Sequence, residues 1–246
     1  MSPVWNCSVT HGNKKQKHMR TKSILAAAAI IAAGAASSMA QSNVYSLNVV
    51  GYVNVVCSNG YTMINTPLIP SNAQIGTLLD DGANGKTVVP ANSAVFTFAG
   101  GSFVANFSDE FGGGWSNPTQ ALTNGTGYFF LNNQPTPVTI TYVGEVPQGS
   151  LTNKLNAGYN LVGSQVPQAG FISNLGLTTT AGDSVFKFKN GNFVAYFNDE
   201  FGGGWSSTAV DFDVNLGPNL NVGEGMFYFR SDINGSATWN RNFTVQ

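Results

Sequence analysis

Residues 102–116, SFVANFSDEFGGGWS, recur with little change as residues 192–206, NFVAYFNDEFGGGWS. Twelve of the fifteen positions are identical, at a constant offset of 90. The match extends upstream, where residues 94–98 (AVFTF) correspond to residues 184–188 (SVFKF) at the same offset. A repeat of this length indicates that the chain contains an internal duplication, which decides how the rest of the sequence is interpreted.

The duplication continues on both sides of these segments at a larger offset. Gly60-Tyr61 corresponds to Gly158-Tyr159, and LTNGTGYFF from Leu122 corresponds to LNVGEGMFY from Leu220, both at an offset of 98. Val-Gly-x-Val occurs at Val50 and again at Val143 and marks the start of each copy. We therefore place the first β-repeat at residues 44–143 and the second at residues 144–246.

The junction between the copies contains no linker rich in Ser, Gly or Pro. A strand predicted at residues 139–143 runs directly into the second copy. This junction favours two domains with a tight mutual interface, or one domain of approximate twofold symmetry, over two flexibly tethered domains.

The best-defined local structure is a hairpin around Asn190-Gly191. Asn-Gly is typical of a two-residue type I′ turn, which places Phe188 opposite Phe193. Because side chains alternate along strands, Phe186, Phe188, Phe193 and Phe197 share one face, which we expect to anchor the core. Lys187 and Lys189 fall on the other face, which we expect to meet water. The first copy repeats this pattern with Phe96, Phe98, Phe103 and Phe107 around Gly100-Gly101.

Further strands are expected at residues 128–131 and 226–229, each preceded by Gly-x-Gly. Short apolar runs bounded by Gly, Asn and Pro are typical of strands and turns. Short helical turns are expected only at residues 73–79 and 171–175.

Residues 1–40 have the features of a secretory signal peptide. A basic cluster at residues 14–22 precedes an apolar run at residues 24–36, and small residues lead to a cleavage site after Ala40. Met19 already opens a complete signal peptide, so residues 1–18 are interpreted as a misassigned start. The apolar run is too short to span a membrane, and no integral span is expected after cleavage.

Taken together, the duplication, the strand pattern and the leader predict an all-β protein of two tandem homologous β-sandwich or barrel-like repeats, tightly apposed, after a cleaved signal peptide.

The composition beyond residue 40 excludes several classes of function. Five of the 11 Lys and Arg residues precede residue 41, whereas all 12 Asp and Glu residues follow it, which leaves a formal net charge of −6. Nucleic acid is therefore an unsuitable partner. Both histidines and Cys7 also precede the cut, so residues 41–246 have no histidine and one cysteine, Cys57. Histidine-dependent nucleophilic catalysis, a Cys/His zinc site and an intrachain disulfide are excluded, and we expect a protein that is not an enzyme.

Three interpretations of DEFGGGW compete. The first is a hairpin turn, in which the glycines permit unusual backbone angles, the carboxylates cap the turn and Trp packs on the sheet. The second is a calcium site, because carboxylate oxygens suit hard cations. The third is a platform where Trp stacks on a sugar. The candidate metal ligands are Asp109, Glu110, Asp199 and Glu200, and the candidate sugar-binding residues are Trp115 and Trp205.

The chain resembles a family of uncharacterised secreted bacterial proteins. The resemblance is carried by NVVGYVNV at residues 48–55, the joint that begins GEVPQG at residues 144–149 and continues to Gly170, and the two DEFGGGW segments. It implies export and a duplicated β fold, and it assigns no activity, cofactor or functional residue.

These observations predict an exported, non-enzymatic protein with a structural or adhesive role in the cell envelope or extracellular space. A pair of carbohydrate-binding modules using Trp115 and Trp205 is the first alternative, and a calcium-stabilised surface protein is the second. Glycans or envelope components are the expected partners. The sequence predicts neither the ligand nor the oligomeric state.

Overall fold

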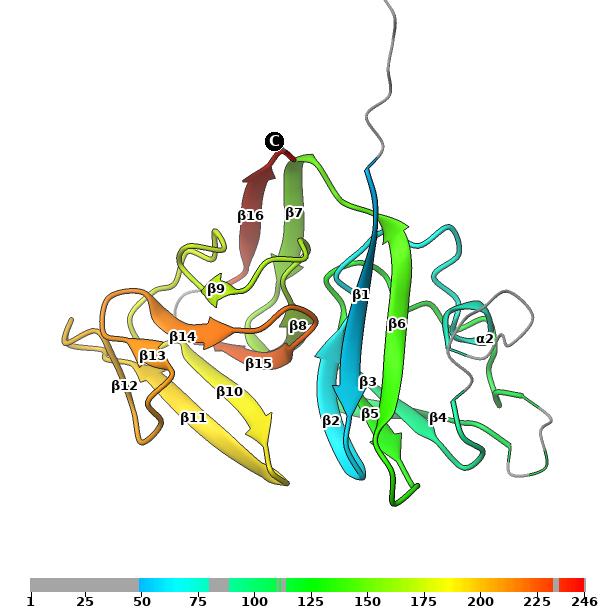
Figure 1. Cartoon of the computed structure of the whole chain (residues 1–246). Coiled ribbons are helices and arrows are strands. Elements are labelled where there is room, and N and C mark those ends of the chain that lie inside the picture. The colour runs from blue at the N-terminus through cyan, green and yellow to red at the C-terminus, as the bar shows by residue number, and fades with distance from the viewer. Residues whose placement is uncertain (1–48, 80–88, 110, 112–113, 232–234, 246) are drawn as a thin grey trace, which may run out of the picture. The chain divides into compact units, whose positions relative to one another are not determined.

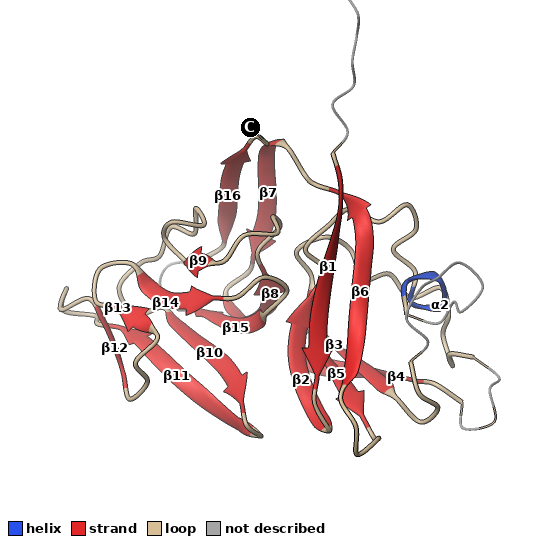
Figure 2. Ribbon diagram, in the orientation of Figure 1, coloured by secondary structure: helices blue, strands red, loops and turns tan. Residues whose placement is uncertain are grey.

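The structure is a computed structural model that describes residues 49–79, 89–109, 111, 114–231 and 235–245. These residues all belong to one compact unit, Asn48–Gln246. They form an all-β structure of antiparallel sheets with a single short helix, α2 (Ile75–Leu78) (Figures 1 and 2). No helix within the described part of the chain is long and apolar enough to cross a membrane. The predicted signal peptide and Met19 lie outside the described residues.

The first half of the described chain forms a two-stranded ribbon and a four-stranded sheet (Figure 1). The ribbon pairs β1 (Val50–Cys57) with β6 (Val138–Glu145). The sheet has the order β2-β5-β3-β4. Its strands are β2 (Gly60–Asn65), β3 (Ala94–Ala99), β4 (Ser102–Phe107) and β5 (Gly127–Asn132).

The second half also has a ribbon, which pairs β7 (Gly149–Leu155) with β16 (Ala237–Phe243). Its main sheet has the order β12-β11-β10-β15-β8, and a small sheet has the order β13-β14-β9. The junction predicted at residue 143 falls inside β6, whose pairing with β1 continues to Glu145. The remaining strands are β8 (Gly158–Gly163), β9 (Gly170–Phe171), β10 (Ser184–Lys189), β11 (Asn192–Asn198), β12 (Trp205–Ser207), β13 (Phe212–Asp213), β14 (Gly217–Leu220) and β15 (Gly225–Arg230).

The hairpin register predicted from Asn190-Gly191 is confirmed. Phe188 pairs with Phe193 across β10 and β11, and both turn residues have positive φ, 49° for Asn190 and 80° for Gly191. The hairpin of β3 and β4 has the same register, with Phe98 opposite Phe103. The Phe side chains of each hairpin therefore share one face, as the alternation predicted.

The prediction that this Phe face anchors the hydrophobic core of each half is wrong. Phe103 and Phe193 are 51% and 52% exposed. The opposite face is the buried one, because Val185 on β10 and Tyr196 on β11 are fully buried in the hydrophobic cluster of the second half. Val95 on β3 is likewise buried in the cluster of the first half. Each main sheet thus packs its aliphatic and tyrosine face inward and turns its phenylalanine face outward.

The prediction that Lys187 points to water is also wrong. Its side chain is 1% exposed, and its ammonium lies 3.0 Å from an Asp211 carboxylate oxygen and 2.8 Å from one of Glu224. A buried ammonium is tolerated when carboxylates neutralise it and backbone groups accept its remaining protons. Here the Asn219 carbonyl accepts a further hydrogen bond from the same nitrogen. Lys189, also predicted to face water, is partly exposed and forms an ion pair with Asp211.

The two halves meet through matched backbone contacts. An isolated antiparallel bridge joins Ile64 to Glu224, and another joins Thr126 to Val162, which are the same positions shifted by 98. The Asn65 amide donates to the Gly223 carbonyl at 2.9 Å, and the Gly163 amide donates to the Gly125 carbonyl at 3.1 Å. Each half therefore contributes the same donor and acceptor positions to the contact.

Two glycines allow the halves to approach this closely. A Cβ on Gly127, the first residue of β5, would lie 2.7 Å from the Val162 amide nitrogen. A Cβ on Gly225, the first residue of β15, would lie 2.7 Å from the Ile64 carbonyl oxygen. These are the second glycines of the two Gly-x-Gly segments, so this motif provides the space in which backbone meets backbone.

We expect Gly127→Ala and Gly225→Ala each to destabilise the protein by about 1–3 kcal/mol, towards the upper end because the obstructing atoms are backbone. Gly170→Ala is the control, because its Cβ would lie 3.6 Å from the nearest atom, in the Leu175 side chain. Chemical denaturation of the three variants measures the difference. Equal stability of Gly127→Ala and Gly170→Ala would contradict the close approach.

Candidate functional site

The outward Phe faces of the two main sheets join into one group of twelve aromatic side chains, here called the aromatic face. The rings are linked by contacts with centroid separations of 5.1–6.3 Å. Six belong to the first half and six to the second, at offsets of 90 or 98. They are Tyr61, Phe96, Phe98, Phe103, Phe107 and Phe129, and Tyr159, Phe186, Phe188, Phe193, Phe197 and Phe227.

At the centre of the aromatic face, Phe129 and Phe227 contact each other at a centroid separation of 6.3 Å. Each of them lies edge-on to a phenylalanine of the other half, Phe129 to Phe188 at 5.2 Å and Phe227 to Phe98 at 5.1 Å. Edge-to-face pairs of this kind stabilise beyond the area that they bury. Phe129 and Phe227 are buried, together with Met63 and Leu161, so the face has a core of its own.

Every ring contact among these twelve side chains has a counterpart at the equivalent positions; Tyr159 makes one further contact, with Phe229 at 4.8 Å, where the first half has Leu131. Tyr61 lies 5.7 Å from Phe96, and Tyr159 lies 5.9 Å from Phe186. The central rings are buried, whereas the outer ones are half-exposed to nearly the same degree. The outer rings are Tyr61, Phe103, Phe107, Tyr159, Phe193 and Phe197, all 50–54% exposed.

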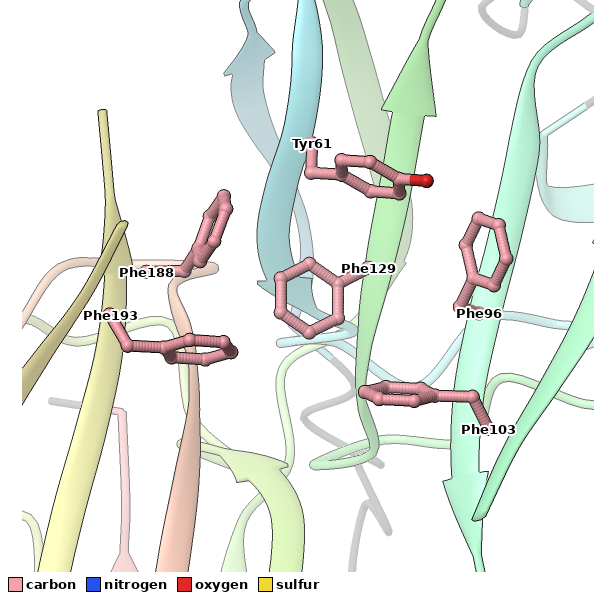
Figure 3. A pocket seen from close by; sticks show the side chains of 6 residues that line it. All are labelled: Tyr61, Phe96, Phe103, Phe129, Phe188 and Phe193. Carbon is pink, nitrogen blue, oxygen red and sulfur yellow. The ribbon is translucent and has the colours of Figure 1, made fainter. Parts of the chain in front are cut away.

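Two pockets open on the aromatic face. The first has a volume of about 360 Å³, and Figure 3 shows Phe129 in its middle, with Phe188 and Phe193 of the second half on one side and Phe96 and Phe103 on the other. The second has a volume of about 520 Å³. Its aromatic lining consists of the counterparts of the six residues of the first pocket: Tyr159, Phe186, Phe193, Phe227, Phe98 and Phe103.

The chemistry of these pockets is almost purely apolar. The side-chain polar group in each lining is one tyrosine hydroxyl, from Tyr61 or Tyr159. Glycan sites need convergent hydrogen-bonding groups that fix the sugar hydroxyls, and these linings provide none beyond that hydroxyl. The arrangement is suited to aromatic and aliphatic groups, which gain free energy by leaving water.

The two tryptophans proposed as a sugar platform are buried. Trp115 is 5% exposed and Trp205 is 4% exposed, and each belongs to the hydrophobic cluster of its half. A sugar cannot stack on a ring that neighbouring side chains already cover. The role predicted for Trp115 and Trp205 in a carbohydrate-binding module is therefore corrected: they are core residues.

The described residues of the two DEFGGGW segments make the backbone contacts that the hairpin-turn interpretation requires. The Asp109 amide donates to the Gly114 carbonyl at 2.8 Å, and the Asp199 amide donates to the Gly204 carbonyl at 2.9 Å. Both aspartates cap the turn: Asp109 Oδ1 accepts the Phe111 amide at 2.6 Å, and Asp199 Oδ1 accepts the Phe201 amide at 3.2 Å.

The calcium interpretation finds little support in these turns. Asp199 Oδ2 accepts the Gly203 amide at 2.9 Å, so both of its oxygens already bind backbone donors. Glu200 is exposed and lines a surface pocket of about 410 Å³ beside Asp199. Within the described residues, no three His, Cys, Asp or Glu side chains are grouped to hold a metal ion. Glu110 lies outside the described residues.

A cluster of charged and polar side chains surrounds Lys187 on the buried face of β10. Asp211 accepts hydrogen bonds from Lys187, Lys189 and the Tyr196 hydroxyl. Burial raises the pKa of the Asp211 carboxyl, but the hydrogen bonds from Lys189, Tyr196 and Lys187 outweigh burial and hold the pKa well below its usual range. Because its charges are neutralised within the cluster, this group is structural.

Cys57 is a small buried side chain of the first half's hydrophobic cluster. It is fully buried and unpaired. Burial raises the pKa of its thiol to about 12, against a smaller lowering by the hydrogen bond with Thr62. The thiol is therefore protonated at neutral pH and is unreactive as a nucleophile.

No protein family model, curated protein or solved structure matches this chain. The candidate site therefore rests on geometry alone. Sequence reasoning placed eight of the twelve aromatic residues in hairpin cores and did not identify them as a site. The sequence did contain a signal: phenylalanine recurs at the same positions of two segments, as in FVAxF at residues 103–107 and 193–197, on strands that need only one apolar face to fold.

We expect the stability of the protein to decrease as pH falls from about 5 towards 2, in part because Asp211 must take up a proton. A carboxyl whose folded pKa is lowered stabilises the fold above its unfolded pKa of about 3.9, and that contribution is lost as pH falls towards the folded value. Denaturation of wild type and Asp211→Asn at pH 7 and pH 3 tests this assignment. The difference in unfolding free energy between the two proteins should shrink at pH 3, and a constant difference would contradict it.

Proposed function

We propose that this chain is an exported, non-enzymatic β-repeat protein that adheres to apolar surfaces through its aromatic face, in the cell envelope or extracellular space. The observation that carries the proposal is the set of six half-exposed aromatic side chains arranged around two apolar pockets of matching composition. A soluble monomer rarely exposes a contiguous apolar patch of more than about 300–600 Å² unless the patch has a function.

Two tandem homologous repeats are part of this proposal. The strand orders β2-β5-β3-β4 and β8-β15-β10-β11 support it, because they list corresponding strands in the same sequence. The ribbons β1–β6 and β7–β16 also occupy corresponding places in the chain. Duplication explains why the aromatic face has two equivalent pockets, since each pocket takes four aromatic residues from one repeat and two from the other.

Export is proposed from residues 1–40 alone. The basic cluster, apolar run and small residues before Gln41 are the supporting features. An exported location is consistent with a face that presents phenylalanine to water, because such a face would associate non-specifically in the crowded cytoplasm.

A glycan is a less suitable partner for this face than an apolar surface. Trp115 and Trp205 are buried, and the pocket linings lack the amide and carboxylate groups that sugar hydroxyls require. The proposal therefore concerns envelope or extracellular components with apolar groups.

Adsorption to a phenyl-substituted support tests the proposal. The protein is isolated from the exported fraction of a producing strain, where its intact mass also shows whether the chain begins at Gln41. Wild type should be retained on the phenyl support and not on the unsubstituted matrix. Phe103→Ser with Phe193→Ser should reduce retention strongly, because these two rings line both pockets.

Phe111→Ser with Phe201→Ser is the matched control. These two phenylalanines are 88% and 95% exposed, but they lie on the DEFGGGW turns and do not line either pocket. The control variant should be retained like wild type. An equal loss of retention in both double variants would show that any exposed phenylalanine is enough for binding to the support. That result would overturn the assignment of the aromatic face.

A further inference from the structure

We infer that the aromatic face binds a second copy of this chain and forms a face-to-face homodimer. The inference rests on the proposed function and names a second copy as the partner of the same surface, so the phenyl support competes with that copy for the aromatic face. It is carried by three features: the area of the face, its lack of charge, and its division into two equivalent halves.

The area is close to what a stable dimer needs. An aromatic side chain buries about 150–250 Å² when fully covered, and six aromatic residues of the face are 50–54% exposed. Covering them removes roughly 600 Å² per copy, before the partly buried rings and the rim are included, against about 800 Å² per partner in a standard interface.

The partner must offer an apolar surface of similar extent. Phe103 and Phe193 line both pockets, and the other lining residues are aromatic apart from Gly101. A charged partner would lose hydration on this face without gaining ion pairs. A second aromatic face meets the requirement, because homodimer interfaces are more apolar and richer in aromatic residues than other surfaces.

The equivalence of the two halves suits a symmetric pair. In a twofold dimer the same surface of each copy faces the other, so protrusions and hollows must be complementary within one surface. Here half-exposed rings from both halves stand beside pockets of about 360 and 520 Å³. Because the lining of one pocket is the counterpart of the other, Phe103 and Phe193 of one copy meet equivalent surroundings on the second.

The net charge gives the association a diagnostic salt dependence. Residues 41–246 carry a formal net charge of −6, so two copies repel each other at long range. Salt screens that repulsion within a Debye length of about 10 Å at 0.1 M. An apolar interface between two such chains should therefore tighten as salt is added, whereas an interface held by ion pairs should weaken.

Sedimentation equilibrium of residues 41–246 at micromolar concentrations tests the dimer. Wild type should have twice the monomer mass, with a dissociation constant that falls as sodium chloride increases. Phe103→Ser with Phe193→Ser should raise the dissociation constant by roughly tenfold or more. Phe111→Ser with Phe201→Ser should leave it unchanged.

A charge-complementation pair makes the face-to-face geometry testable even if serine at these sites alters the surface in other ways. One variant carries Phe103→Lys and Phe193→Lys, and the other carries Phe103→Glu and Phe193→Glu. Each alone should be monomeric because like charges would oppose each other, and an equimolar mixture should form a heterodimer. A folded, monomeric mixture would overturn the face-to-face dimer.

The outcomes separate this inference from the proposed function. A monomeric wild type that is still retained on the phenyl support overturns the dimer and leaves adhesion standing. A monomeric wild type that is not retained overturns both. A dimer unaffected by Phe103→Ser with Phe193→Ser would place the interface elsewhere on the chain and would also overturn the inference.

Discussion

The close approach of backbone to backbone at Gly127 and Gly225 is the constraint on which the rest of the structure depends. At these two points a Cβ would lie 2.7 Å from the backbone of the opposite half. The matched amide-to-carbonyl bonds of Asn65 and Gly163 hold the same crossing. β5 and β15 begin at these glycines. Phe129 and Phe227, two residues further along each strand, therefore contact each other just beyond the crossing.

Because of this crossing, the two faces of each main sheet have different surroundings. The inner faces bury Val95, Val185 and Tyr196 in separate clusters, one per half. The junction covers part of the outer faces: among the described residues it buries Phe129 and Phe227 with Met63 and Leu161, and four more phenylalanines of the two hairpins pack partly buried against them. The outer rings around that centre are half-exposed, and together with the buried pair they make up the aromatic face.

Sequence reasoning succeeded where local chemistry decides the structure. Asn190-Gly191 fixes the turn, the turn fixes which residues pair, and the alternation fixes which side chains share a face. Alternation does not decide which face is buried, so the phenylalanine face was placed in the core and Lys187 in water. Lys187 is buried because Asp211 and Glu224, from later segments of the chain, neutralise it. Contacts such as Phe98 with Phe227 join positions too distant in sequence for any local pattern to predict, so the site was missed.

Hydroxyl-radical footprinting of the phenylalanine rings tests the aromatic face most directly, because it reports exposure residue by residue. In dilute protein, Phe103 and Phe193 should oxidise readily while Phe129 and Phe227 are protected, and at high concentration Phe103 and Phe193 should become protected as well. Equal oxidation of all four rings in dilute protein would contradict the junction at Gly127 and Gly225. Protection of Phe103 and Phe193 at every concentration would contradict an exposed aromatic face.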